Sequence, residues 1–285
     1  MKKVLTLIFS LLLIMQVFSQ EKKDTTYWKK GGNFSINMNQ ISFTNWAAGG
    51  LNSVSGTSRT QAFANYQKGI TSWDNIIDLG YGLSKVDSSV VKKNDDIIEL
   101  QSKLDIKAAD KLFYSAMLDF KSQFGPGYSD AENKKEISNF LAPAYLTLSF
   151  GMDYKPSNKF SIVFAPITEK MTIVTDTSLA RNYGLKTGKT TRMEFGALLK
   201  AAVNTDIVKN VGMLSEITLF SDYFNHMENI VVDWKVAINM KINDYLSAQL
   251  NTQLLYDHNI KFPPVTGKAK VQFKELFGVG LSFKF

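Results

Sequence analysis

Cysteine is absent from the 285-residue chain, and histidine occurs only twice. The lack of cysteine excludes a disulfide scaffold, a cysteine nucleophile, an iron–sulfur site and a thiolate zinc site. It also excludes a lipoprotein, because the lipid of that class is attached to a cysteine just after the signal peptide. Two histidines leave little for a histidine-rich metal centre. We therefore predict neither a cofactor nor a metal site.

Long hydrophobic runs are missing except at the N-terminus. Lys2 and Lys3 precede an apolar run over residues 4–18, which is shorter than the roughly 20 residues that a membrane helix needs. A retained helix is the alternative, but the pattern predicts a secretory signal peptide over residues 1–19, cleaved near Ser19/Gln20. Its removal takes two lysines and no acids, so the formal charge falls from +7 to 7 − 2 = +5.

What the rest of the chain does contain is strict alternation of apolar and polar residues. The clearest runs lie near 193–203, 232–242 and 246–256. A period of two indicates strands with one apolar face and one polar face. Runs of about 11 residues exceed the usual soluble strand and match the length that crosses a bilayer at a tilt. With no second apolar helix, the mature chain is either soluble or spans a membrane as a closed β-barrel.

Twelve segments share this pattern, although 96–108 also fits one face of a helix. We predict an all-β fold, a closed antiparallel transmembrane barrel of about 12 strands, with ten and fourteen as the alternative counts. The expected domains are the signal peptide, a periplasmic tail over 20–32 and the barrel over 33–285. The expected strands are 33–42, 58–68, 73–84, 96–108, 112–124, 139–154, 159–169, 191–204, 211–222, 230–242, 245–256 and 271–285.

The connections between these segments alternate between short and long. Links such as 69–72 and 109–111 are short, whereas 125–138 and 170–190 are long and rich in Gly, Asn, Asp and Lys. Short periplasmic turns opposite long extracellular loops are typical of outer-membrane barrels. A soluble β-sandwich is not expected to place its short connections at one end and its long connections at the other. The last segment also alternates up to the terminal Phe285, which resembles the C-terminal signal read by the barrel-assembly machinery.

Several short motifs occur in order along the chain. They are Asn45-Trp46-Ala47-Ala48-Gly49-Gly50 with Asn52, Lys93-Asn94-Asp95-Asp96, Gln123-Phe124 with Gly127-Tyr128, Ile137-Ser138 before Leu141-Ala142-Pro143-Ala144-Tyr145, Ala165-Pro166-Ile167-Thr168, Glu194-Phe195-Gly196-Ala197, and Tyr256-Asp257. This set resembles an outer-membrane β-barrel family of the Bacteroidota known as domain of unknown function 3078. The resemblance implies an outer-membrane location, and it carries no catalytic residues over.

The wet faces of the strands hold charges of both signs, which we expect to point into the lumen. They either line a pore that selects solutes or pair with one another to fill a narrow barrel. The candidate lumen residues are Glu99, Lys103, Asp105, Asp119, Lys121, Arg192, Glu194, Lys200, Glu216, Asp233 and Lys235. The segment with Trp46, Gly49 and Gly50 either folds inward as a constriction or caps the surface, since paired glycines allow tight turns.

Catalytic motifs are scarce. A hydrolase would need a nucleophile activated by His226 or His258, and Asp257 is the neighbour that would orient His258. We interpret both histidines as surface-loop residues and predict that the chain is not an enzyme. The Asp95-Asp96 pair falls in an expected loop, where a solvated turn is favoured over a calcium or lipopolysaccharide bridge.

These patterns predict a protein of the Gram-negative cell outer membrane. The first hypothesis is a porin-like channel or transporter for small solutes. The second is a non-conducting structural, receptor or envelope-assembly barrel, and the third is an outer-membrane hydrolase. The expected partners are outer-membrane lipid, lipopolysaccharide and the barrel-assembly machinery. Nucleic acid is not expected, because the lysines are scattered singly.

Overall fold

The computed structural model describes residues 26–42, 51–130, 135–262 and 267–285. The predicted signal peptide, residues 20–25 of the predicted tail, and Trp46, Gly49 and Gly50 lie outside the described residues. No helix in the described part of the chain is long and apolar enough to cross a membrane.

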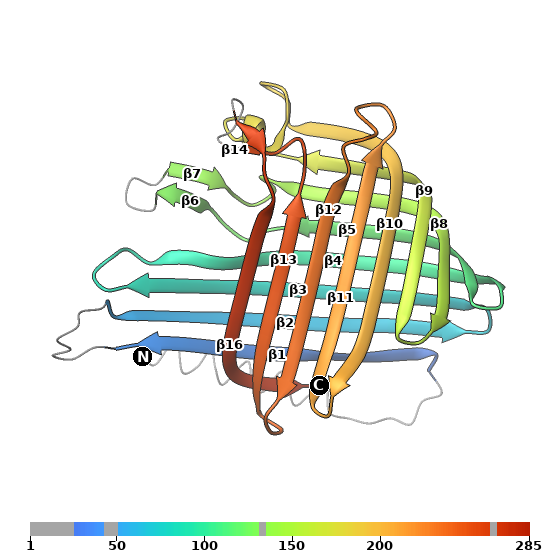
Figure 1. The fold of residues 1–285 in the computed structure, drawn as a ribbon, viewed down its shortest axis with the longest axis horizontal. Helices are drawn as coiled ribbons and strands as arrows, with labels where there is room; N and C mark the ends of the chain where they lie inside the picture. The colour runs from blue at the N-terminus through green and yellow to red at the C-terminus, as the bar shows by residue number, and fades with distance from the viewer. Residues whose placement is uncertain (1–25, 43–50, 131–134, 263–266) are drawn as a thin grey trace.

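Twelve antiparallel strands form one closed barrel (Figure 1), which confirms the predicted fold class and strand count. The chain closes on itself where Asn33–Asn37 of the first strand pair with Gly280–Lys284 of the last. The order around the ring is β1-β16-β13-β12-β11-β10-β9-β8-β5-β4-β3-β2. The strands are β1 (Trp28–Ile41), β2 (Ser53–Lys68), β3 (Thr71–Val86), β4 (Lys92–Ala109), β5 (Leu112–Ser122), β8 (Ala144–Ser157), β9 (Phe160–Ile173), β10 (Thr191–Val208), β11 (Val211–Asp222), β12 (Val231–Lys241), β13 (Leu246–Tyr256) and β16 (Gln272–Lys284).

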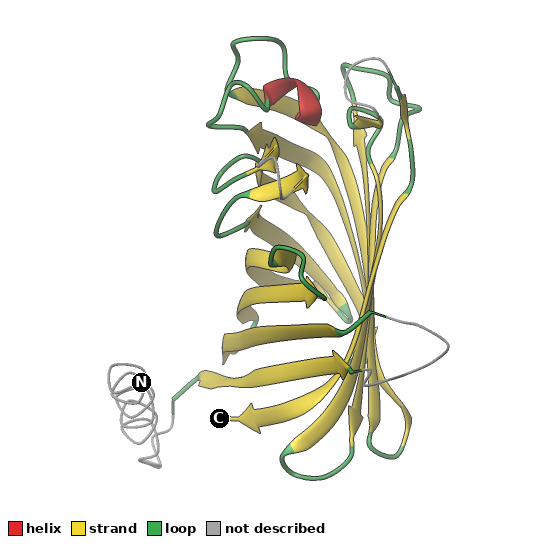
Figure 2. Cartoon of the chain, turned by 90° about the vertical axis from the view of Figure 1, so that its left-hand side faces the viewer, coloured by secondary structure: helices red, strands yellow, loops and turns green. Residues whose placement is uncertain are grey.

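The connections sort to opposite ends of the barrel as predicted. One end, the turn end, carries the tight connections such as Gly69–Ile70 and Asp110–Lys111. The other, the loop end, carries two small hairpins and a 3-10 helix, which is the red element at the top of Figure 2. These elements are β6 (Gly127–Asp130) with β7 (Lys135–Ser138), β14 (Lys261–Phe262) with β15 (Lys268–Ala269), and η1 (Ala180–Tyr183).

Several predicted strand boundaries were wrong by four or five residues, including the start of β2 at Ser53 instead of 58, and two of them have a clear local cause. β1 begins at Trp28, so residues 28–32 belong to the barrel wall and not to the tail. The Trp28 ring packs on Tyr66 and Trp73, at centroid distances of 5.3 and 5.7 Å, and this aromatic contact stabilises the added strand. β8 begins at Ala144 instead of 139, because Pro143 has no N–H for a strand ladder.

The outward faces of the strands are apolar. Large hydrophobic side chains remain exposed there, as expected for a surface that contacts lipid. Examples are Ile36, Trp73, Leu100, Leu118, Phe150, Phe164, Trp234 and Phe277. Exposed Tyr114, Tyr154 and Tyr245 lie near the turn end, and exposed Phe124, Phe140 and Tyr223 near the loop end, so aromatic residues ring the barrel at both levels.

The strands on two opposite walls of the barrel run in crossing directions. Strands β10–β13 and β16 pass in front of β1–β5 in Figure 1 and run in a different direction. Between them, on the side nearest β9, five buried apolar side chains form a core inside the lumen. These residues are Met117, Val163, Ala165, Leu198 and Phe220. The polar strand faces predict a polar interior, and in this sector a hydrophobic core takes its place.

Strand irregularities near this core depend on glycine. Gly196 lies where the register of β10 with β9 shifts, and a Cβ atom there would collide with the Ser221 carbonyl oxygen. Because the backbone of β11 cannot yield without loss of pairing, we expect Gly196→Ala to lower the free energy of unfolding by about 1–3 kcal/mol. Urea unfolding of the refolded barrel measures this. Gly125→Ala is the matched control, since no heavy atom lies within 4 Å of its added methyl group. Equal stability of both variants would contradict the prediction.

Candidate functional site

Ion pairs span the lumen from wall to wall. The Lys235 ammonium lies 2.5 and 2.7 Å from the two carboxylate oxygens of Glu99, and Lys121 Nζ lies 2.6 Å from Asp233 Oδ2. β12 is fourth in the ring and β4 is tenth, so Lys235 and Glu99 come from diametrically opposite strands. We call Glu99, Lys121, Asp233 and Lys235 the cross-lumen belt. Side chains from opposite walls therefore meet within the lumen at this level.

Further polar groups complete the belt. Gln253 donates a hydrogen bond of 2.7 Å to Asp233 Oδ1. Lys200 Nζ lies 3.1 Å from Glu216 and 3.8 Å from Asp119, on the adjoining part of the wall. Each charge of the belt therefore has a neighbour of opposite sign, as a dry interior requires.

A second group of charges fills the lumen between β4 and β8. Lys103 Nζ lies 2.6 Å from Asp153 and 3.4 Å from Asp105, and Lys155 Nζ lies 2.6 Å from Asp105 and 3.6 Å from Asp153. Both carboxylates are fully buried. We call Lys103, Asp105, Asp153 and Lys155 the inner quartet. Each lysine bridges both acids, so the quartet acts as one cross-linked unit.

A third group lies at the loop end. Lys170 Nζ is 3.2 Å from Asp257 and 3.4 Å from Glu194, and the Arg192 guanidinium is 3.1 Å from Glu194. We call Lys170, Arg192, Glu194 and Asp257 the outer cluster. Asn259 also donates to Glu194 at 3.1 Å, so the loop after β13 is tied to β10.

Asp257 makes the outer cluster sensitive to acid. Burial opposes ionisation of its carboxyl, but the Lys170 ammonium outweighs this and holds the pKa of Asp257 below its usual 3.8. A lowered pKa stabilises the fold above pH 3.8, and this contribution is lost as the pH falls through the lower folded-state pKa. We expect Asp257→Asn to lower the melting temperature at pH 6, with the difference from wild type shrinking towards pH 3. A difference that is independent of pH would contradict this assignment.

An apolar cluster covers part of the loop end. Ala142, Val174, Leu179, Ala180 and Leu185 are buried together, and Tyr183 packs against them. Tyr183 also donates a 2.8 Å hydrogen bond to the Ile137 carbonyl, and burial raises its pKa to about 12. We call this cluster the lid. It joins the loop between β5 and β8 to the loop between β9 and β10.

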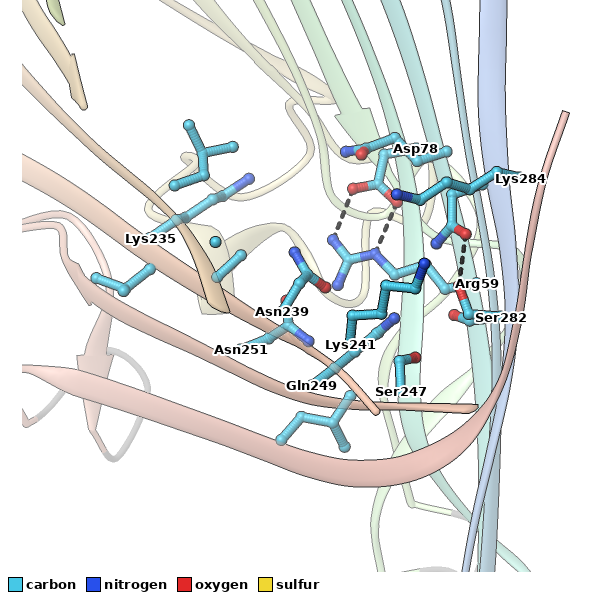
Figure 3. A pocket seen from close by; sticks show the side chains of 18 of the residues that line it. Arg59, Asp78, Lys235, Asn239, Lys241, Ser247, Gln249, Asn251, Ser282 and Lys284 are labelled. Carbon is cyan, nitrogen blue, oxygen red and sulfur yellow. Dashed lines mark hydrogen bonds and ion pairs between the residues drawn. The ribbon is translucent and has the colours of Figure 1, made fainter. Parts of the chain in front are cut away.

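A cavity of about 940 Å³ occupies the part of the lumen that reaches the turn end of the barrel. Its lining comes from β1–β4 on one wall and β10–β13 and β16 on the other. It extends to Asn210, Asn243 and Lys284 at the turn end, and its lining includes Glu99 and Lys235 of the belt as well as Asp95 and Lys274, which lie near the loop-end starts of β4 and β16. Figure 3 shows the lining side chains projecting into it from both walls. We call this cavity the chamber.

The structure brings the candidate lumen residues into these groups. Glu99, Lys121, Asp233 and Lys235 form the belt, and Asp119, Lys200 and Glu216 adjoin it. Lys103 and Asp105 belong to the inner quartet, and Arg192 and Glu194 to the outer cluster.

Sequence reasoning did not select several partners of these charges. Asp153 and Lys155 fell at the predicted end of a strand, and Lys170 and Asp257 fell in predicted loops. Arg59 and Asp78, whose bidentate pair has N···O distances of 2.8 and 2.6 Å, sit on the wet faces of predicted strands and were identifiable by parity alone.

The Asp95-Asp96 pair is not a solvated turn, because both residues lie in β4. Asp95 is buried and pairs with Lys274 of β16, and Asp96 pairs with Lys93 at 2.7 Å. Asp96 also accepts hydrogen bonds from the Phe124 and Gly125 amides. Asp95 therefore pairs with a distant strand and Asp96 pairs locally, so neither carboxylate is a solvated turn residue.

His226 and His258 line one small pocket together with Glu194 and Asp222, but no hydrogen bond among the described residues joins either histidine to a serine or to Asp257. His226 Nδ1 lies 3.0 Å from Glu228 on the surface, where both side chains are mostly exposed. Asp257 is engaged by Lys170 and by the Asn259 amide instead of orienting His258. No group of three or more His, Asp or Glu side chains suited to a metal ion occurs in the described ranges.

The closed antiparallel ring satisfies its backbone hydrogen bonds internally, presents apolar side chains outward and holds its charges inside. These are the requirements for crossing a membrane with strands. The chain is an outer-membrane β-barrel. Residues 38–128 match the family described as "Protein of unknown function (DUF3078)". This match confirms the resemblance predicted from the motifs in that segment. No curated protein sequence matches the chain.

Solved outer-membrane barrels resemble it in architecture. The translocator domain of the autotransporter NalP from Neisseria meningitidis is 9% identical, with a TM-score of 0.40, over 99% of this chain and 96% of that one. An outer-membrane channel from Pseudomonas putida F1 is 11% identical, with a TM-score of 0.40, over 93% and 100%. The outer-membrane channel DcaP of Acinetobacter baumannii is 8% identical, with a TM-score of 0.32, over 90% and 95%.

Proposed function

We propose that the lumen of this outer-membrane barrel is blocked by side chains, so that the protein is not an open diffusion pore. One observation carries the proposal: Lys235 and Glu99 meet in the lumen from diametrically opposite strands. The apolar core around Phe220 fills the neighbouring sector, and the lid covers part of the loop end. Of the functions that the sequence leaves open, a non-conducting receptor or structural barrel fits this interior best.

The test is single-channel recording of the purified, refolded protein in a planar bilayer. We expect no stepwise conductance at moderate voltage, because ions cannot pass side chains that touch across the lumen. Regular conductance steps from the wild-type protein would overturn the proposal. The heat-modifiable gel shift of the same preparation verifies that the barrel is folded.

A gated transporter of small solutes is the second candidate. The chamber favours it, because a polar cavity bordered by cross-lumen ion pairs resembles part of an interrupted pathway. Solute-dependent conductance, or uptake into vesicles that carry the protein, would favour this candidate over the first.

We propose no enzymatic role. The support is the engagement of Asp257 by Lys170 and the surface position of His226. Replacement of both histidines by alanine is expected to leave any hydrolysis seen in a preparation unchanged. Loss of hydrolysis in that double variant would reinstate the hydrolase hypothesis.

We propose, further, that the chain reaches the outer membrane by cleavage of the predicted signal peptide. The support is the basic residues and short apolar run of the N-terminus. N-terminal sequencing of the protein isolated from outer membranes is expected to begin at Gln20.

A further inference from the structure

The charges that line the chamber neutralise one another. Arg59 is paired with Asp78, Lys235 with Glu99 and Lys274 with Asp95. Lys241 is paired with Asp244 at 2.6 Å, and Glu216 with Lys200. Within the described residues, the lining charges that lack a charged partner are one acid, Asp206, and one base, Lys284. A charged solute would therefore find no excess of the opposite sign in the chamber.

The remaining polar lining is dominated by side-chain amides. They come from both walls, and each carries a donor and an acceptor side by side. Those that make no hydrogen bond to another described residue include Gln61, Gln101, Asn204, Asn239, Gln249 and Asn251. In Figure 3, Asn239, Gln249 and Asn251 lie on the β12–β13 wall and face the Arg59–Asp78 pair on the opposite wall.

Two polar side chains of this lining make no side-chain hydrogen bond to another described residue. The Gln249 residue is 7% exposed. Ser247 Oγ is fully buried and unpaired among the described residues. Buried polar groups normally have a partner, because leaving one unpaired costs about 1–3 kcal/mol. Both residues line the chamber, and the Gln249 amide, whose polar atoms are not fully buried, is available to a solute there.

We propose that the chamber binds a neutral polyhydroxylated solute, such as a small saccharide, which enters from the turn end. Each hydroxyl of such a solute donates and accepts hydrogen bonds, which is the complement of a field of free amides. The cavity of about 940 Å³ lies within the usual range for ligand pockets, about 300–1,000 Å³. The proposal rests on the proposed function only in taking the belt as the closed end of the chamber.

The experiment is isothermal titration of the full, refolded barrel with maltose. The detergent is lauryldimethylamine oxide, because a detergent with a sugar headgroup would compete for the site. Citrate and arginine serve as anionic and cationic comparators of small size. We expect saturable heat with maltose and none with either ion. The absence of saturable binding of maltose, or binding of citrate or arginine at the same strength, would overturn the proposal.

The amides are tested by the double variant Asn239→Leu/Asn251→Leu. Loss of the hydrogen bonds made by two amides is expected to weaken maltose binding about tenfold. Asn158→Leu is the matched control, since Asn158 is an exposed turn residue outside the chamber lining, and binding is expected to be unchanged. Equal binding by the double variant and the wild type would overturn the proposal.

Bilayer recording of the same preparations separates this inference from the proposed function. Saccharide binding by a conducting barrel would overturn closure alone. A silent barrel that binds no saccharide would overturn the saccharide site alone.

Discussion

The double variant Lys121→Ala/Lys235→Ala is expected to conduct ions where the wild-type barrel is silent. Both substitutions remove side chains that cross the lumen, and they leave Glu99 and Asp233 without their cations. Acidic side chains around a water-filled constriction select cations. We therefore expect conductance steps with a reversal potential that favours cations in a salt gradient across a planar bilayer.

A lysine outside the lumen provides the control for this experiment. Lys189 lies exposed in the loop between β9 and β10, and Lys189→Ala is expected to stay silent. A folded double variant that also stays silent would show that the belt is not the barrier. Anion-selective steps would contradict the role assigned to the two remaining acids.

Removal of one acid from the inner quartet is expected to have the largest effect on stability. Asp105 is fully buried and contacts both Lys103 and Lys155. Asp105→Ala leaves two lysines against the single acid Asp153, and loss of one partner from a buried pair costs about 3–5 kcal/mol. Urea unfolding of the refolded protein, followed by gel migration or tryptophan fluorescence, measures the loss.

Two comparisons sharpen this prediction. Asp244→Ala breaks the exposed pair with Lys241 and is expected to change stability too little to measure. The double variant Asp105→Ala/Lys155→Ala removes one charge of each sign and is expected to be less destabilised than Asp105→Ala alone. Equal losses in the single and double variants would mean that burial of the remaining lysine charge is not the cause.

The sequence predicts the wall of the barrel well because each strand has one face towards lipid and the other towards the polar interior. Lipid outside and a polar interior impose a period of two that reads directly from residues such as Trp234, Val236 and Ile238. The alternation of short turns and long loops then fixes which strands are neighbours. The same parity is enough to place Glu99 and Lys235 on the inward faces of their strands.

The interior is predicted less well, because its contacts depend on how far apart the walls lie. Nothing in the pattern around Glu99 specifies that Lys235 reaches it from the opposite wall. The core around Phe220 was also missed, since Met117 and Leu198 occupy the wet faces of their strands and look like isolated exceptions there. The closure of the lumen, and so the choice between pore and closed barrel, is a property of three-dimensional packing.

The cross-lumen belt also constrains the order in which the barrel can fold. Lys235 and Glu99 are separated by 136 positions in the chain, and Lys121 and Asp233 by 112. Contacts of such high sequence separation pay a large loop-closure entropy and form late in folding. Until β4, β5 and β12 are all in place, the charges of the belt lack their partners from the opposite wall. Formation of the belt is thus a late event that would report the completion of assembly.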